Sequence, residues 1–144
     1  MREIKFRGKD MNGHWVYGLL TKKKIRNSGK LSLAIAKDDC SLGNTIPVNE
    51  KTVGEFTGLK DKNGVEIYDG DIVEKYGVRW DGWQNVPSNE KQRYAVYREN
   101  GEWYIGIPKM VEEQGLYYTS LTYFDSGEYE VVGNIFEGGT DERN

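Results

Sequence analysis

Residues 52–74 read TVGEFTGLKDKNGVEIYDGDIVE, which is a strand pattern interrupted by an Asn-Gly dipeptide. Asn63 and Gly64 both tolerate positive φ, which the type I′ hairpin turn requires at its two central residues. Strand-forming residues lie on either side, over Val53–Leu59 and Val65–Tyr68. The segment therefore predicts a β-hairpin, followed by a further strand that begins at Ile72.

Two more Asn-Gly dipeptides, Asn12-Gly13 and Asn100-Gly101, repeat this signal elsewhere in the chain. Each is flanked by strand-like residues, so three hairpins are expected; the flanking segments are Ile4–Arg7, His14–Leu20, Tyr94–Arg98 and Trp103–Ile107. The first two hairpins also share the pattern Asp-x-Asn-Gly-x-x-x-Tyr. This is explained either by common turn chemistry or by an internal duplication, and two short matches favour common turn chemistry.

The rest of the chain adds short strands and little helix. Further strands are expected at Leu31–Ile35, Ile46–Val48 and Tyr129–Phe136, with a loop over Asp38–Asn44. Residues Trp80–Arg93 are polar and contain Pro87, which suggests a long excursion or a short irregular helix. Pro108–Gln114, closed by Gly115, predicts one or two helical turns, since proline suits the first turn and glycine the end.

These patterns predict an all-β fold, mainly antiparallel and barrel- or sandwich-like, with at most one or two short helices. A length of 144 residues favours a single domain over residues 1–144. Within it, a soft division near Tyr76-Gly77 separates lobes 1–76 and 77–144.

Composition excludes several classes of function. The net charge of −3 gives no overall electrostatic basis for binding nucleic acid or an anionic membrane. One cysteine, Cys40, forms no internal disulfide, which favours a reducing cytoplasm. No apolar segment is long enough to span a membrane, and no cleaved leader is expected at the start of the chain.

Neither a metal site nor a nucleophilic catalytic site is predicted. Aligning Gly64 with the glycine of a calcium loop places Leu59 first and Gly70 twelfth, where that loop needs acids. A single His14 and a single Cys40 cannot build a tetrahedral zinc site, and neither lies in a catalytic motif. No cofactor, metal or catalytic residue is therefore expected.

Carboxylates gather in the central segment, where Asp61, Asp69 and Asp71 lie within eleven residues of one another. Paired carboxylates serve as acid and base or hold magnesium in hydrolases and nucleases. Aspartate is equally common as a former of tight turns, and that interpretation is favoured here.

Positive charges gather in Lys22–Lys30, with no acid between Thr21 and Ala36. These charges, with the aromatic residues Trp80, Trp83, Tyr94 and Tyr97 further along the chain, suggest contacts to phosphates and stacked bases. The alternative, a solvated hairpin whose lysines prevent edge-to-edge aggregation, is favoured. The residues considered for partner binding are Lys22, Lys23, Lys24, Arg26, Trp80, Trp83, Asp69 and Asp71.

Residues 52–74 also resemble the YopX family of phage and prophage proteins. Met1–Arg7 with Trp15–Gly18 is similar to the opening of that family, and Glu130–Glu137 to its close. The usual Asn-Pro-Glu-Leu ending is replaced here by Gly138-Gly139-Thr140. The resemblance implies a β-rich fold, encoded on mobile elements and acting in the cytoplasm of a bacterial host, and it brings no established activity.

Three functional hypotheses follow. The leading one is a phage or prophage accessory protein that works without catalysis, by binding a phage or host protein or by assembling as a homo-oligomer. The first alternative is a carboxylate-dependent hydrolase or nuclease that uses Asp61, Asp69 and Asp71. The second is nucleic-acid binding through the Lys22–Lys30 hairpin.

Overall fold

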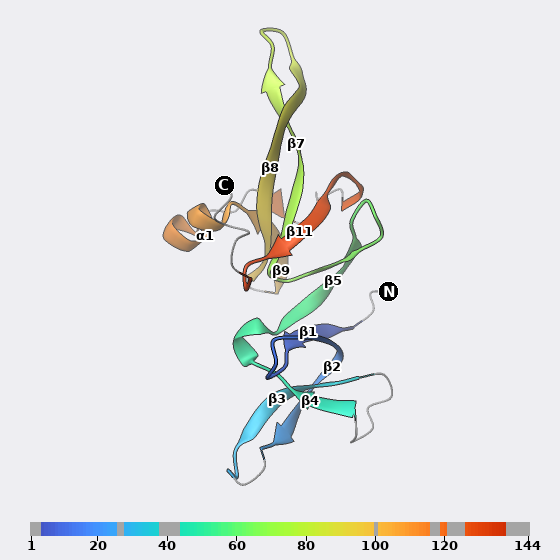
Figure 1. Cartoon of the computed structure of the whole chain (residues 1–144). Helices are drawn as coiled ribbons and strands as arrows, with labels where there is room; N and C mark the ends of the chain where they lie inside the picture. Colours follow the sequence, from blue (N-terminus) through green and yellow to red (C-terminus); the bar gives the residue numbers. More distant parts are fainter. Residues whose placement is uncertain are drawn as a thin grey trace. The chain divides into compact units, whose positions relative to one another are not determined.

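The computed structural model describes residues 4–25, 28–37, 44–99, 101–115, 119–120 and 126–137. The fold is all-β, with two antiparallel sheets, as predicted (Figure 1). Two compact units divide the chain at residues 58 and 59, within a strand. The predicted soft division at Tyr76-Gly77 lies inside a later strand, and the organisation as one domain stays a prediction.

The first unit, residues 1–58, is built from antiparallel strands. Its strands occur in the order β4-β3-β2-β1-β5 across the sheet. Their bounds are β1 (Phe6–Lys9), β2 (Trp15–Lys24), β3 (Leu31–Ala36), β4 (Thr45–Pro47) and β5 (Gly54–Lys60), the last of which runs into the second unit. A 3-10 turn at Glu50–Thr52 precedes β5. The core of this unit is built on Val16, Ile35 and Val48.

The second unit, residues 59–144, holds a five-stranded sheet in the order β10-β9-β8-β7-β11. Its elements are β6 (Glu66–Tyr68), β7 (Asp71–Trp80), β8 (Asn85–Glu99), β9 (Glu102–Gly106), α1 (Pro108–Gln114), β10 (Thr119–Ser120), a 3-10 turn at Ser126–Glu128, and β11 (Glu130–Asn134). Its core contains Ile67, Val73, Tyr94, Val96, Ile105 and Tyr129. Helix α1 confirms the prediction at Pro108–Gln114.

The three predicted hairpins are confirmed, but two of them have a different turn. In β1–β2 and in β5–β6, the loop contains three residues, and its glycine donates to the carbonyl of the aspartate three residues earlier. Gly64 has φ 83°, as the last residue of such a loop requires. The expected two-residue type I′ turns are therefore corrected to three-residue loops. The predicted loop Asp38–Asn44 falls almost wholly outside the described residues.

Strands β7 and β8 form a long hairpin where a polar excursion or an irregular helix was expected over Trp80–Arg93. That expectation is wrong, because β7 extends to Trp80 and β8 begins at Asn85 and continues to Glu99. Pro87 lies within β8, opposite Val78, beside a shift in the pairing register. Such irregularities are where a strand tolerates proline.

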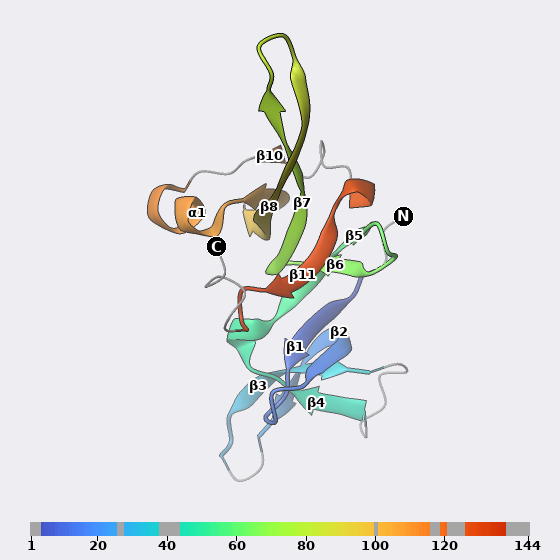
Figure 2. The same cartoon turned by 45° about the horizontal axis from the view of Figure 1, so that its top comes forward.

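The outer part of this hairpin extends beyond its sheet. Strand β11 pairs with β7 only over Asp71–Glu74, and β9 pairs with β8 only over Ala95–Glu99. The remainder of β7 and β8 pairs strand to strand, out to Trp80 opposite Asn85. Both views show this end of the hairpin extending away from the other strands of its unit (Figure 1, Figure 2).

Candidate functional site

Three groups of side chains carry the sequence-based hypotheses, and the structure gives each a different environment. The groups are the acids of the central segment, the lysines of the β2–β3 hairpin and the tryptophans of the β7–β8 hairpin. The first and third groups lie in the second unit, and the second group lies in the first unit.

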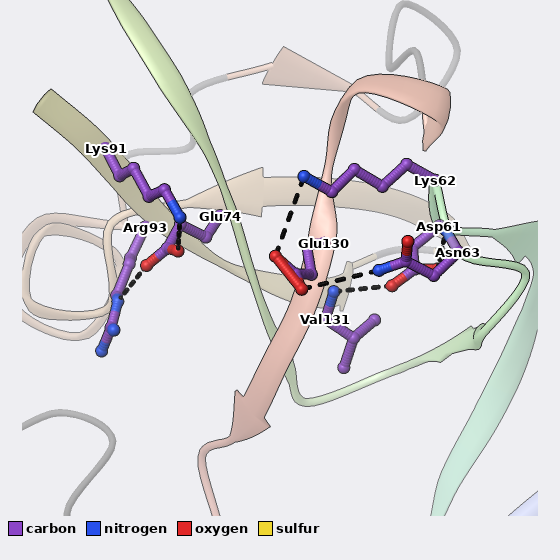
Figure 3. A network of polar contacts seen from close by, with 8 residues as sticks. All are labelled: Asp61, Lys62, Asn63, Glu74, Lys91, Arg93, Glu130 and Val131. Carbon is purple, nitrogen blue, oxygen red and sulfur yellow. Dashed lines mark hydrogen bonds and ion pairs between the residues drawn. The ribbon is translucent and has the colours of Figure 1, made fainter. Parts of the chain in front are cut away.

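Asp61 organises the β5–β6 loop with its carboxylate. Oδ1 accepts hydrogen bonds from the backbone N–H groups of Asn63 and Val65, at 2.8 and 2.9 Å. Oδ2 accepts a third from the N–H of Val131 in β11, at 2.9 Å, as Figure 3 shows. The residue is only 5% exposed. Both oxygens thus have structural partners, as the turn interpretation of this residue predicts.

Asp71 has a similar role at the start of β7. Its Oδ2 accepts a 2.7 Å hydrogen bond from the backbone N–H of Tyr68, and the residue is 1% exposed. Asp69 lies in the turn between Tyr68 and Asp71 and is half-buried. Among the described residues, no group of three or more His, Cys, Asp or Glu side chains could hold a metal ion. Carboxylate-dependent hydrolysis by Asp61, Asp69 and Asp71 stays a prediction.

Glu74 and Glu130 form a polar network next to this loop (Figure 3). They face each other across β7 and β11, an arrangement that is unfavourable for two like charges. Glu74 pairs with Arg93 at 2.7 Å and with Lys91 at 3.4 Å. Glu130 lies 3.8 Å from the ammonium of Lys62. Each acid therefore has a cation of its own, and these ion pairs stabilise the contact between the two strands.

Burial and ion pairing act in opposite directions on Glu74. Burial raises the pKa of its carboxyl group, but the hydrogen bonds and charges of Arg93 and Lys91 together lower it by more. The net pKa lies below the ordinary value of 4.5. Glu74 is therefore charged at neutral pH and holds the base of the β7–β8 hairpin.

The lysines at the end of β2 lie on an exposed strand. Lys23 donates from Nζ to the carbonyl of Thr45, at 3.0 Å. A hollow of about 670 Å³ is lined by Leu19–Lys24 together with Ala36 and Thr45. A second hollow, of about 740 Å³, includes Lys23 and Lys24 with Asp10, Met11, Ile25 and Val48. Arg26, also considered for partner binding, lies outside the described residues.

The tip of the β7–β8 hairpin presents two tryptophans to solvent. Trp83 is 90% exposed and Trp80 is 64% exposed. Asp81, between them, accepts hydrogen bonds from the backbone N–H groups of Trp83 and Gln84 at 2.8 and 3.0 Å. The backbone N–H of Asp81 in turn donates to the carbonyl of Gln84. These contacts fix the turn, so the tryptophans project from a defined support.

Asp81 carries a negative charge between these two aromatic side chains. Hydrogen bonds from Gln84 and Trp83 hold the pKa of its carboxyl group below the ordinary value, against a small opposing effect of burial. The importance of Asp81 was not foreseen from the sequence. The signal that reveals it is the Asp-Gly-Trp order, in which an aspartate starts a turn and binds the amide two residues on.

Comparison with known proteins identifies the family of this chain. A model of the YopX protein family matches residues 5–139. The chain belongs to the YopX family. Among curated proteins, none matches this YopX-family chain. It is similar to the crystal structure of protein EF1440 from Enterococcus faecalis, at 22% identity and a TM-score of 0.49, over 94% of each chain.

The structure of this YopX protein separates residues that the base-stacking hypothesis had grouped. Tyr94 is buried in the core of the second unit and makes an edge-to-face contact with Tyr129. Tyr97 is half-buried. Of the four aromatics considered, only Trp80 and Trp83 are exposed, and they lie in a different unit from Lys22–Lys24. Within the described residues, no helix is both long and apolar enough to cross a membrane.

Proposed function

We propose that this YopX protein is a non-enzymatic binding module that holds a phage or host protein through the tip of its β7–β8 hairpin. The observation that carries the proposal is the exposure of Trp80 and Trp83 on a turn that extends beyond its sheet. Tryptophan is one of the residues enriched at the energetic centres of protein interfaces. Two large apolar side chains left in water on a fixed support are thus well suited to fill pockets of a partner.

The order of the tip supports this role. Because the carboxylate of Asp81 holds the turn, little conformational entropy is lost when the tryptophans bind. The hairpin is anchored at its other end, where Glu74 pairs with Arg93 across the two strands. A rigid, pre-organised contact element is what a binding module needs.

The carboxylate between the two tryptophans favours a protein over a nucleic acid or a lipid surface. The ionised carboxylate of Asp81 lies between the tryptophans and repels phosphate groups. The chain as a whole carries −3, which adds no attraction to a polyanion. A tip-to-tip contact between two copies would also bring two Asp81 carboxylates together, so we assign the partner as a different protein.

The remaining observations agree with this proposal. Asp61 and Asp71 have their carboxylates on backbone N–H groups, which suits structural roles. The YopX resemblance implies a phage or prophage origin and the cytoplasm of a bacterial host as the place of action. The protein then acts as an accessory factor whose effect depends on what it binds.

Affinity capture from a bacterial lysate, with the Trp80→Ala/Trp83→Ala variant as comparison, tests the proposal. We expect the wild-type chain to retain a specific protein that the double variant loses. Met110→Ala is the matched control, because Met110 is an exposed apolar residue of the same unit away from the tip. Equal capture by both variants would contradict the proposal. Loss of self-association in the double variant would instead make a second copy the occupant.

A further inference from the structure

We propose that the section of β2 beyond its pairing with β1, from Leu19 to Lys24, binds an extended acidic segment of another protein by β-strand addition. This surface lies in the first unit and is independent of the tryptophan tip. Three observations carry the inference: the direction of the backbone groups, the charge of the strand and the hollow along it.

Backbone geometry shows which groups of β2 face outward. Ile25 donates to the carbonyl of Lys30, so the odd-numbered residues of this part of β2 face β3. On the other side, β2 pairs with β1 only as far as Gly18 opposite Phe6. Backbone directions alternate along a strand. The N–H and C=O groups of Leu20, Lys22 and Lys24 therefore point to the side where β1 has ended.

Within the described part of the chain, no strand pairs with this section of the edge. Unpaired N–H and C=O groups on a strand edge form a template for another extended chain. A section from Leu19 to Lys24 is as long as an average strand. The edge thus provides main-chain recognition for a peptide.

Charge selects the type of peptide. Lys22 and Lys24 project on one face of the strand, two residues apart. No acidic residue occurs between Thr21 and Ala36 of the sequence, and Asp10 lines the second hollow with Lys23 and Lys24, not the one along Leu19–Lys24. Opposite charges directly across two paired strands are stabilising, and like charges are destabilising. An added strand with acids on alternate residues would meet both lysines.

A hollow beside the strand leaves space for the side chains of the added segment. It measures about 670 Å³ and is lined by the successive residues Leu19–Lys24 together with Ala36 of β3 and Thr45 of β4. Successive side chains of a strand point to opposite faces, so a hollow lined by all of them reaches around the strand edge. The exposed Leu31, opposite Lys24 on β3, adds apolar surface on the lysine face.

The same observations argue against two other occupants. A second copy that paired edge to edge around Lys22 would bring lysines close together, which costs free energy. A nucleic acid would meet the lysines but would leave the peptide-type pattern of N–H and C=O groups on the edge without matching partners. An acidic extended peptide supplies carboxylates for the lysines and also N–H and C=O groups that match those of the strand edge.

The test uses amide hydrogen exchange followed by NMR in the full chain. In the free protein, the Leu20, Lys22 and Lys24 amides should exchange at least tenfold faster than those of Thr21 and Lys23, which face β3. The probe is a synthetic peptide of alternating glutamate and valine. We expect it to slow exchange at Leu20, Lys22 and Lys24 at least tenfold.

Two control peptides separate strand addition from simple charge attraction. A peptide of alternating lysine and valine should not bind, and a glutamate-valine peptide methylated on alternate backbone nitrogens should bind at least tenfold more weakly. Equal binding of the methylated peptide would contradict strand addition. Failure of the glutamate-valine peptide to bind at all would overturn the proposal.

Charge reversal provides the matched protein variants. Lys22→Glu/Lys24→Glu should weaken binding of the glutamate-valine peptide at least tenfold. Lys51→Glu/Lys60→Glu makes the same change of net charge at exposed positions outside β2 and should have little effect. Preferential binding of oligothymidylate, also lost in the first variant, would reassign the surface to nucleic acid. Because these variants keep Trp80 and Trp83, failure here is distinguishable from failure of the proposed function.

Discussion

The carboxylate of Asp61 accepts a hydrogen bond of 2.9 Å from the backbone N–H of Val131, although the two residues lie 70 positions apart. The same carboxylate closes the three-residue loop between β5 and β6. One side chain therefore fixes a local turn and also ties that turn to strand β11. Asp10 closes the β1–β2 loop in the same way, with contacts to Asn12 and His14, both at 2.9 Å.

The two loops provide an internal comparison. Asp61→Ala removes three hydrogen bonds at a buried site, and we expect it to lower the free energy of unfolding by about 2–3 kcal/mol. Asp10→Ala removes contacts at an exposed loop, where water replaces them, so its effect should be clearly smaller. Urea denaturation of both variants measures the difference. Equal effects would show that the contact with Val131 adds no stability.

Gly70 differs from Gly64 in its surroundings but hardly in its φ angle, which is 90° at Gly70 and 83° at Gly64. A Cβ atom at Gly70 would lie 2.7 Å from the ring of Phe136, whereas one at Gly64 would meet nothing within 4 Å. Gly64→Ala should cost about 1 kcal/mol from positive φ alone. Gly70→Ala should cost about 1–3 kcal/mol more, from overpacking. Thermal and urea unfolding check this order, and a reversed order would contradict the packing of Phe136 on Gly70.

Glu74 makes stability depend on pH in a defined direction. Its pKa in the folded protein lies below the ordinary 4.5, so its ion pairs stabilise the fold above that value. The contribution is lost as the pH falls through the lower, folded pKa. Glu74→Gln should therefore be less stable than wild type at pH 7, and the difference should shrink as the pH falls below about 4.5.

Unfolding by urea at neutral and acidic pH measures this convergence. Glu130→Gln is the control, since Glu130 is more exposed and lies 3.8 Å from its cation. Removing the acid that faces Glu74 also relieves a repulsion, so Glu130→Gln should change stability little at pH 7. A difference between Glu74→Gln and wild type that stayed constant from neutral to acidic pH would contradict the assigned ion pairs.

Local sequence signals predict the hairpins and the helix of this protein because each depends on a few neighbouring residues. Asn-Gly dipeptides mark the three turns, and Pro108 with Gly115 bounds α1. The outer part of β8 was missed for a physical reason. A two-stranded ribbon exposes both faces, so Asn85–Lys91 shows no alternation of apolar and polar residues, and Pro87 argues against a strand.

The candidate sites were predictable only in part. Exposure of Trp80 and Trp83 depends on the length of a hairpin that the sequence pattern does not reveal. The contact of Asp61 with Val131 joins distant segments, and no local signal reports it. The section of β2 that extends past β1 follows from β1 being the shorter strand, which depends on the pairing register.

The most direct test of the binding role is the dissociation constant of the captured protein. It is measured for the purified wild-type chain and for the Trp80→Ala/Trp83→Ala variant. Isothermal titration calorimetry, with Met110→Ala as control and circular dichroism to verify folding, provides it. Two exposed tryptophans at the centre of an interface should make the double variant bind at least a hundredfold more weakly, at about 1.4 kcal/mol for each factor of ten. A folded double variant that bound as tightly as wild type would contradict the assignment of the hairpin tip.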